Sequence, residues 1–181
     1  MKRISTLMMA VGMAGAAVSQ TPKQSPEPFL RVHTNFSLTV HASYPNTAPL
    51  FGPNGERVWA REDWNPLFIY PQPANDVQGA VFTVRHGPFN TVWVNTLFDV
   101  DARHFQYVYF LPALLVTVID VRFRPLGPDT TAVDVDYTRT ALTAEGNERV
   151  AAMDKIDKRA GTEWQTAIDK YLAQSGACSK P

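Results

Sequence analysis

The stretch FGPNGERVWAREDWNPLFIYP, residues 51–71, contains the pattern that decides the fold of this chain. It places Trp59, Trp64 and three prolines within 21 residues. Solvent-exposed loops rarely carry so much aromatic surface, so the stretch predicts a short helical insert that closes over an interior space. It contains no histidine, no catalytic nucleophile and no metal-ligand pair, and it therefore says more about architecture than about catalysis.

On the N-terminal side of this insert, apolar and polar residues alternate. Over residues 30–42 the apolar residues fall on one face, while the polar residues, among them His33 and His41, fall on the other. A period of two over this length predicts a long half-buried strand. Residues 48–59 then predict two short helices around the Gly52-Pro53 break, with Glu56 in the first turn of the second, where the helix dipole favours an acid.

On the C-terminal side, five alternating segments follow, separated by short polar turns: 79–86, 91–98, 105–111, 114–124 and 131–140. This spacing predicts an antiparallel meander. From Thr143 onward apolar residues recur every three or four positions, which predicts one long amphipathic helix over 144–173 with Thr143 as its N-cap. Gly161 lies inside this helix and would permit a close approach to the sheet. The helix is the only predicted element long enough to cover the apolar face of the sheet.

Several of these segments resemble those of a known superfamily. Residues 49–71 (PLFGPNGERVWAREDWNPLFIYP) are similar to the P-L-F-x-P-x-G-E-x-x-W-x-x-x-W-x-P segment of a group of small bacterial proteins of the START/Bet v 1-like (SRPBCC) superfamily. Residues 79–87 (GAVFTVRHG), 91–99 (TVWVNTLFD) and 141–150 (ALTAEGNERV) resemble later segments of that group, so the resemblance covers about residues 29–172. The chain departs from the pattern at Arg61–Trp64, where the group more often has a glycine before the tryptophan.

The resemblance implies an α+β helix-grip fold, in which a curved antiparallel sheet wraps around a long C-terminal helix and two short helices follow the first strand. It also implies a cavity between sheet and helix that takes apolar or aromatic small molecules. Members of the superfamily include lipid-transfer modules, plant hormone receptors and polyketide cyclases. The fold alone does not choose among these functions.

The length of 181 residues favours a single domain. Lys2-Arg3 and the uncharged residues 4–18 predict a secretory signal peptide over residues 1–19, which would make the protein periplasmic or secreted. An uncleaved membrane anchor is the alternative, although the apolar run is shorter than the ~20 residues that a spanning helix needs. A Pro-rich linker (20–28), the helix-grip domain (29–174) and a flexible tail (175–181) complete the predicted organisation.

Charge and cysteine content exclude several classes of function. The chain has 17 basic and 17 acidic residues, and loss of Lys2 and Arg3 on cleavage would leave 15 against 17, a net charge of −2. No basic surplus is present to neutralise phosphates, so nucleic-acid binding is not expected. The single cysteine, Cys178, allows no intrachain disulfide. Because no histidine or cysteine set has metal-ligand spacing, we expect neither a metal nor another cofactor.

Candidates for acid–base chemistry are few. No serine or cysteine occupies a nucleophile context, which disfavours covalent hydrolysis. His86, at the end of a predicted strand, is either a turn residue or a proton-transfer group at a cavity mouth. Asp120 alternates with Arg122 on a strand face expected to form ion pairs outside the sheet; facing inward, it would be a buried charge able to act on a ligand. Tyr137 completes this set of candidates.

Aromatic residues carry the main functional signal. They recur across elements expected to surround one space, where they either line a ligand cavity or fill the core. The predicted ligand-binding residues are Trp59, Trp64, Phe68, Phe82, Trp93, Tyr107, Tyr137, Met153 and Trp164. We therefore expect an exported domain that binds an apolar small molecule or lipid without catalysis. The alternatives are a polyketide cyclase-like or dehydratase-like enzyme that uses His86, Asp120 or Tyr137, and a structural or protein-interaction module of the cell envelope.

Overall fold

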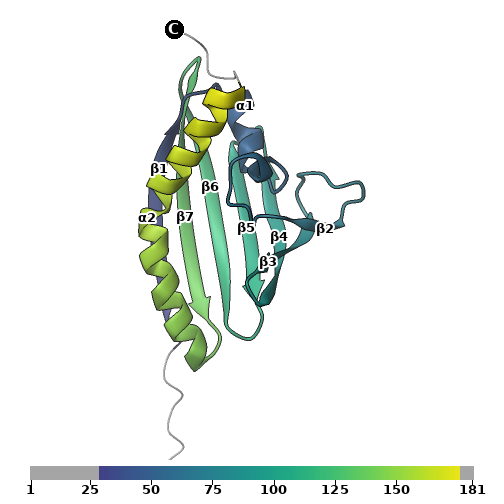
Figure 1. The fold of residues 1–181 in the computed structure, drawn as a ribbon, viewed down its shortest axis with the longest axis vertical. Helices are drawn as coiled ribbons and strands as arrows, with labels where there is room; N and C mark the ends of the chain where they lie inside the picture. Colours follow the sequence, from purple (N-terminus) through teal and green to yellow (C-terminus); the bar gives the residue numbers. More distant parts are fainter. Residues whose placement is uncertain (1–28, 176–181) are drawn as a thin grey trace, which may run out of the picture.

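The computed structural model describes residues 29–175, which form a seven-stranded antiparallel sheet and one long helix (Figure 1). The predicted signal peptide and linker, and Cys178 in the predicted tail, lie outside the described residues. The elements in chain order are β1 (Arg31–Val40), α1 (Tyr44–Thr47), the 3₁₀ helices η1 (Ala48–Phe51) and η2 (Gly55–Val58), β2 (Leu67–Tyr70), β3 (Val81–His86), β4 (Phe89–Asp99), β5 (His104–Leu111), β6 (Leu115–Gly127), β7 (Thr130–Ala141) and α2 (Ala144–Ser175).

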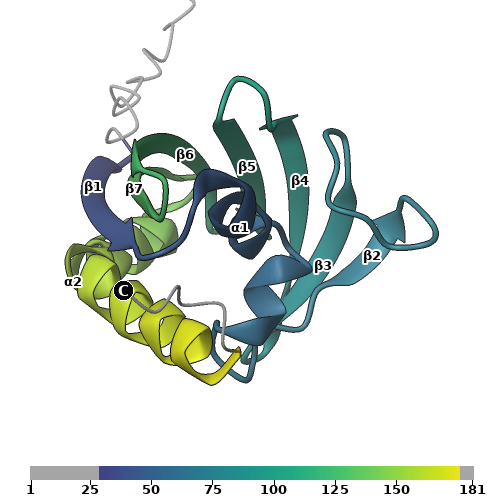
Figure 2. The ribbon, with the colours of Figure 1, turned by 90° about the horizontal axis from the view of Figure 1, so that it is seen from above.

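The strands lie in the order β1-β7-β6-β5-β4-β3-β2. Strands β2 to β7 therefore form a meander, and β1 pairs with β7 at its far edge. Seen from above, the sheet curves around an interior (Figure 2). Helix α2 contacts β1, β7 and β6, and the short helices between β1 and β2 lie over one end of this interior. The structure confirms the predicted helix-grip fold. No helix within residues 29–175 is long and apolar enough to cross a membrane.

Helix α2 is fixed to the sheet along its length. Its first turn is capped by Thr143, whose Oγ1 accepts a hydrogen bond from the backbone N–H of Gly146 at 3.1 Å. A Cβ on Gly146 would lie 2.1 Å from the backbone oxygen of Leu114, and one on Gly161 would lie 3.1 Å from the Phe36 ring. Both glycines therefore allow the helix backbone to approach the sheet closely, as predicted for Gly161.

The strand pattern differs from the prediction in two places, and prolines explain both. Strand β2 was not predicted, because Pro66 and Pro71 flank its four residues; it forms the outer edge of the sheet, beside β3, where missing N–H groups do not interrupt a ladder. Strand β6 continues past the expected turn at Pro125 and ends at Gly127, with a register shift between these two residues that accommodates the proline.

The insert of residues 44–64 contains the two predicted short helices, the first formed by α1 and η1 without a break and the second by η2, and its backbone is held by side chains. The Asp76 carboxylate accepts hydrogen bonds from the backbone N–H groups of Asn54 and Gly55. Trp59 donates from its Nε1 to the Leu50 oxygen at 2.6 Å, and Trp64 donates to the Pro53 oxygen at 3.0 Å. A Cβ on Gly55 would lie 1.6 Å from the Pro49 oxygen, so only glycine fits there.

We predict that Gly146→Ala destabilises the domain by roughly 1–3 kcal/mol, because the added methyl group collides with the Leu114 backbone and pushes α2 from the sheet. Urea unfolding of the purified domain measures this change. Ala151→Gly, at an exposed position of the same helix, is the control and tests helix propensity alone, with an expected loss of about 1 kcal/mol. A Gly146→Ala variant as stable as the wild type would contradict the packing argument.

Candidate functional site

One row of side chains crosses the concave face of the sheet from β2 to β7. The strand registers align its members as Phe68, Phe82, Trp93, Tyr109, Thr117 and Arg139. The rings on the β2 side are stacked, with centroids 5.4 Å apart for Phe68 and Phe82, and 4.3 Å apart for Trp93 and Tyr109. The row therefore changes from aromatic under the insert to polar under α2.

The polar end of the row is a buried ion pair between sheet and helix. Arg139 on β7 donates from Nε to Asp157 Oδ2 at 2.6 Å and from Nη2 to Asp157 Oδ1 at 2.8 Å, and both residues are 5% exposed. Burial alone would lower the pKa of Arg139, but the hydrogen bonds and charge of Asp157 raise it above its usual value. The guanidinium therefore stays charged inside the domain.

The same guanidinium fixes two hydroxyl groups of the row. Its Nη1 donates to the Tyr109 hydroxyl and, at 2.9 Å, to Thr117 Oγ1. Because the Tyr109 oxygen accepts from Arg139, its own hydrogen is left to be donated elsewhere, and the nearest acceptor is Met153 Sδ at 3.9 Å. A thioether is a weak acceptor, so Tyr109 is a hydrogen-bond donor held in place without a strong partner.

A second polar group, Glu56, approaches the interior from the insert. The residue is half-buried, and no hydrogen bond or ion pair joins its carboxyl group to another residue within 29–175. Burial and the nearby Asp76 charge raise its pKa well above the usual value for glutamate. The Glu56 charge also acts on the hydroxyls of Tyr107 and Tyr137, whose pKa values are raised chiefly by burial. Tyr137 is thus affected by Glu56 of the insert as well as by Arg139 and Asp157.

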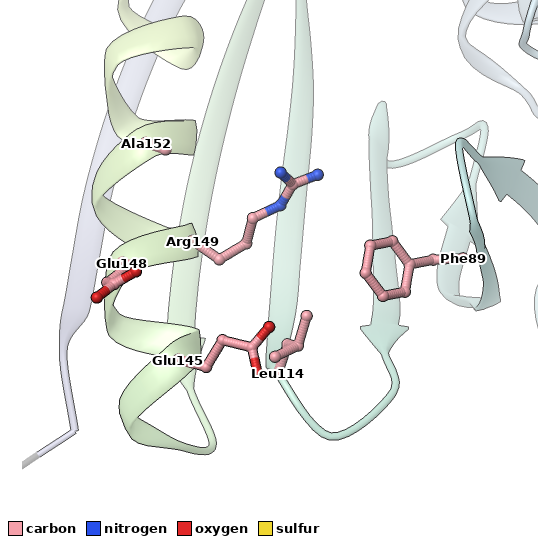
Figure 3. Close-up of a pocket in the computed structure, with 6 residues that line it drawn as sticks. All are labelled: Phe89, Leu114, Glu145, Glu148, Arg149 and Ala152. Carbon is pink, nitrogen blue, oxygen red and sulfur yellow. The ribbon is translucent and has the colours of Figure 1, made fainter.

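An open pocket of about 280 Å³ lies between the first turns of α2 and the sheet (Figure 3). Its lining residues are Phe89, Leu114, Glu145, Glu148, Arg149 and Ala152. Arg149 and Glu145 extend from the helix across the concave face towards the β4 side, where Phe89 faces them (Figure 3). The pocket thus has an apolar base and a charged rim on the helix side, and its last helix residue, Ala152, precedes Met153.

His86 lies beside this pocket at the end of β3. Its register partner is Phe89, and its ring centroid is 6.3 Å from that of Trp93, which places it on the concave face. Burial lowers its pKa, with Asp63 opposing this effect and Arg61 and Arg149 adding to it. The imidazole is therefore neutral at pH 7. This position is compatible with the predicted role at a cavity mouth, which stays a prediction.

The predicted ligand-binding residues form two aromatic groups on the concave side, and none of them lines the pocket. Trp59 and Trp164 pack edge to face at 5.3 Å beneath the insert, close to Phe51 and Phe36. Trp64, Phe68, Phe82 and Trp93 form the second group, on the β2–β4 side. Tyr107 donates its hydroxyl hydrogen to the Phe51 oxygen, Tyr137 lies beneath the Arg139 guanidinium, and Met153 faces Tyr109. Their role in ligand binding stays a prediction.

Asp120 lies on the outer face of the sheet and is not brought to the cleft. Its carboxylate binds His104 Nε2 at 2.7 Å, Gln106 Nε2 at 3.1 Å and Arg122 Nε at 3.0 Å. The expectation of ion pairs outside the sheet is therefore confirmed for this residue, and its alternative role as a buried acid–base group is wrong. The physical reason is strand alternation, because the neighbours Ile119 and Val121 occupy the inner face.

The most important residues of the interior, Arg139 and Asp157, were not singled out in the sequence, although each interrupts an apolar period. Arg139 continues the inward series Val133, Val135 and Tyr137 on β7, and Asp157 falls between apolar positions on the inner face of α2. A charged residue at an apolar position of each element was the available signal. Within residues 29–175 no group of three or more His, Cys, Asp or Glu side chains could hold a metal ion.

We predict that Asp157→Ala lowers the free energy of unfolding by about 3–5 kcal/mol, because it leaves the Arg139 charge buried without a partner. The double variant Arg139→Met/Asp157→Leu should recover most of this loss, since no unpaired charge remains. Glu163→Ala, at an exposed position of the same helix, is the control. Urea unfolding of all four proteins tests the prediction, and equal losses in the single and double variants would contradict it.

We also predict a pH-dependent effect of Glu56→Gln on stability. The pKa of Glu56 is higher in the fold than in the unfolded chain, so its contribution to stability is present at low pH and is lost as the pH rises through the folded-state value. The variant should therefore melt at a higher temperature than the wild type at pH 9 and at the same temperature at pH 4. Circular dichroism melts measure this, with exposed Glu62→Gln as the control.

Comparison with known proteins bears on the fold. No protein-family model matches the sequence, and no curated protein does either. Norcoclaurine synthase from Thalictrum flavum in complex with dopamine and hydroxybenzaldehyde has a TM-score of 0.60 at 14% identity, over 94% of this chain and 98% of that one. The Zhui aromatase/cyclase from Streptomyces sp. R1128 has 0.62 at 13% identity, over 84% and 100%, and Ara h 8.0201 has 0.54 at 13%, over 80% and 99%. The chain therefore has the helix-grip fold of the START/Bet v 1-like (SRPBCC) superfamily.

Proposed function

We propose that this domain binds a compact apolar or aromatic small molecule in the cleft between α2 and the β3–β5 part of the sheet. The observation that carries the proposal is the buried polar group of Arg139, Asp157, Tyr109 and Thr117, set into an otherwise aromatic wall. Ligand sites of this kind combine apolar surface with a few fixed polar groups. The open pocket includes Ala152, the neighbour of Met153, and Met153 Sδ lies 3.9 Å from the Tyr109 hydroxyl of that wall.

Stability alone does not account for the buried ion pair. Taking two charges out of water costs several kcal/mol each, and well-packed apolar residues of similar volume often stabilise a core as well or better. The pair does hold the Tyr109 hydroxyl as a donor without a strong acceptor. A ligand carrying an acceptor atom would complete this hydrogen bond, which a core without a ligand cannot do.

The size of the pocket favours a ring-sized molecule over a long-chain lipid. Its volume of about 280 Å³ lies just below the ~300–1,000 Å³ typical of ligand sites. By analogy of fold, the solved complex of norcoclaurine synthase with dopamine and hydroxybenzaldehyde supports the choice of an aromatic ligand.

A second candidate function is acid–base catalysis of the cyclase or dehydratase type. The specific observation in its favour is that Glu56 and Tyr137, an acid with a raised pKa and a phenol, act on each other electrostatically in the same interior. Turnover of an aromatic polyketide-like substrate that is abolished by Tyr137→Phe, with the fold intact, would favour this function over simple binding.

We predict that the purified domain binds N-phenyl-1-naphthylamine, an uncharged dye whose fluorescence rises in apolar sites, and that Ala152→Trp weakens this binding at least tenfold. Ala152 lines the pocket, so an indole there fills it. Ala151→Trp is the matched control, because this neighbouring alanine is also exposed but does not line the pocket. Fluorescence titration gives the dissociation constants. Equal weakening by both substitutions, or by neither, would place binding elsewhere and contradict the proposal.

A further inference from the structure

Two opposite charges line the open pocket, and the binding site described so far does not use them. Glu145 and Arg149 both line the pocket, and Arg149 follows Glu145 by four positions in α2. An acid four residues before a base has the spacing and the order that favour an ion pair along a helix. Among residues 29–175, however, neither side chain forms an ion pair.

The same spacing does give an ion pair elsewhere in α2. Lys158 follows Asp154 by four positions, and its Nζ lies 2.6 Å from Asp154 Oδ2. The helix therefore permits such pairs, and the separation of Glu145 from Arg149 has a local reason. That reason is the direction of the Arg149 side chain, which extends across the pocket instead of along the helix (Figure 3).

Two observations place the Arg149 guanidinium on the far side of the pocket from its own backbone. It extends towards the β4 side, where Phe89 faces it (Figure 3). Its charge also acts on His86 and helps to lower the pKa of that imidazole, so the guanidinium lies close to the end of β3. His86 is the register partner of Phe89, which lines the pocket. Arg149 therefore spans the opening from α2 to the β3–β4 hairpin.

Glu145 supplies the opposite charge in the same opening. Its side chain points from the first turn of α2 towards Leu114, which forms the apolar base of the pocket together with Phe89 (Figure 3). Glu148 points away from Phe89 and from this base. The helix dipole favours an acid in a first turn, which accounts for Glu145 but not for the unpaired Arg149. The pocket thus presents one carboxylate and one guanidinium beside an apolar base.

We propose that Glu145 and Arg149 bind a small aromatic molecule that carries both an ammonium and a carboxylate group, as an aromatic α-amino acid does. Arg149 donates to the carboxylate of this ligand, and Glu145 accepts from its ammonium group. The ring of the ligand lies on Phe89 and Leu114. This inference rests on the proposed binding function and narrows its ligand class. A ligand with a single charge is disfavoured, because it would meet a like charge in the pocket.

The test compares three naphthalene ligands that differ in their charged groups. At pH 7, 3-(2-naphthyl)alanine carries both groups, 3-(2-naphthyl)propanoate only the carboxylate and 2-(2-naphthyl)ethylamine only the ammonium. We expect the wild-type domain to bind naphthylalanine about fivefold more tightly than either of the other two, as measured by isothermal titration calorimetry. Equal affinities, or tighter binding of a ligand with a single charge, would overturn the proposal.

Two neutral substitutions assign each charge of the ligand to one residue. Arg149→Gln should weaken the binding of naphthylalanine and naphthylpropanoate about fivefold, but not that of naphthylethylamine. Glu145→Gln should weaken the binding of naphthylalanine and naphthylethylamine about fivefold, but not that of naphthylpropanoate. Arg159→Gln and Glu163→Gln are the matched controls, because both residues are exposed on the same helix and neither lines the pocket.

The outcomes distinguish this inference from the proposed function. If N-phenyl-1-naphthylamine binds and Ala152→Trp weakens its binding, but naphthylalanine has no advantage or is insensitive to both neutral substitutions, the role of the two charges is wrong while the binding function stands. If neither this dye nor any of the three ligands binds the wild-type domain, the proposed function fails and the inference fails with it. Circular dichroism confirms that each variant is folded.

Discussion

The buried ion pair between Arg139 and Asp157 is the contact on which the interior of this domain depends. It joins the C-terminal part of β7 to the middle of α2 through two parallel hydrogen bonds, the geometry that gives an arginine–carboxylate pair its directional strength. Through the remaining donors of the same guanidinium, it also orders Tyr109 and Thr117 on the two strands beyond. One charge pair thus fixes both the position of α2 and the polar wall of the cleft. A shift of α2 would therefore also displace the Arg139 guanidinium from Tyr109 and Thr117.

The aromatic side of the cleft is built by a different principle. There, rigid short helices with glycines at close contacts hold Trp59 and Trp64 against the sheet, each by a hydrogen bond from its indole to a backbone oxygen of the insert. Asp76 satisfies the exposed backbone donors at the start of η2. The insert therefore supplies apolar surface and one unpartnered acid, Glu56, whereas α2 and β7 supply matched charge. A molecule between them would meet an aromatic wall on one side and fixed donors on the other.

The sequence allowed β1, the meander and α2 to be predicted, because each of their segments has a period of two or of three to four over seven or more residues. It did not allow β2 to be predicted, because four residues between prolines carry no measurable period. The interior charges Arg139 and Asp157 were not predicted, although each stands in line with apolar neighbours. Glu56 was interpreted as an acid favoured by the dipole of a short helix, and its half-buried position is visible only in the folded insert. Burial of single polar groups depends on tertiary packing, which local patterns do not encode.

The arrangement of α2 has a consequence for how fast a molecule could leave the cleft. The helix is attached to β1, β7 and β6 by the ion pair, by its capped first turn and by glycine contacts with the sheet, whereas the β2–β4 side makes no comparable attachment to it. Lifting the helix would break a buried charge pair, so we expect the cleft to widen more readily by outward movement of the β3–β4 hairpin and the insert. The residence time of a ligand should then depend on the β3–β4 hairpin and the insert. Substitutions that make these two segments more rigid would slow ligand exchange without changing any contact with the ligand.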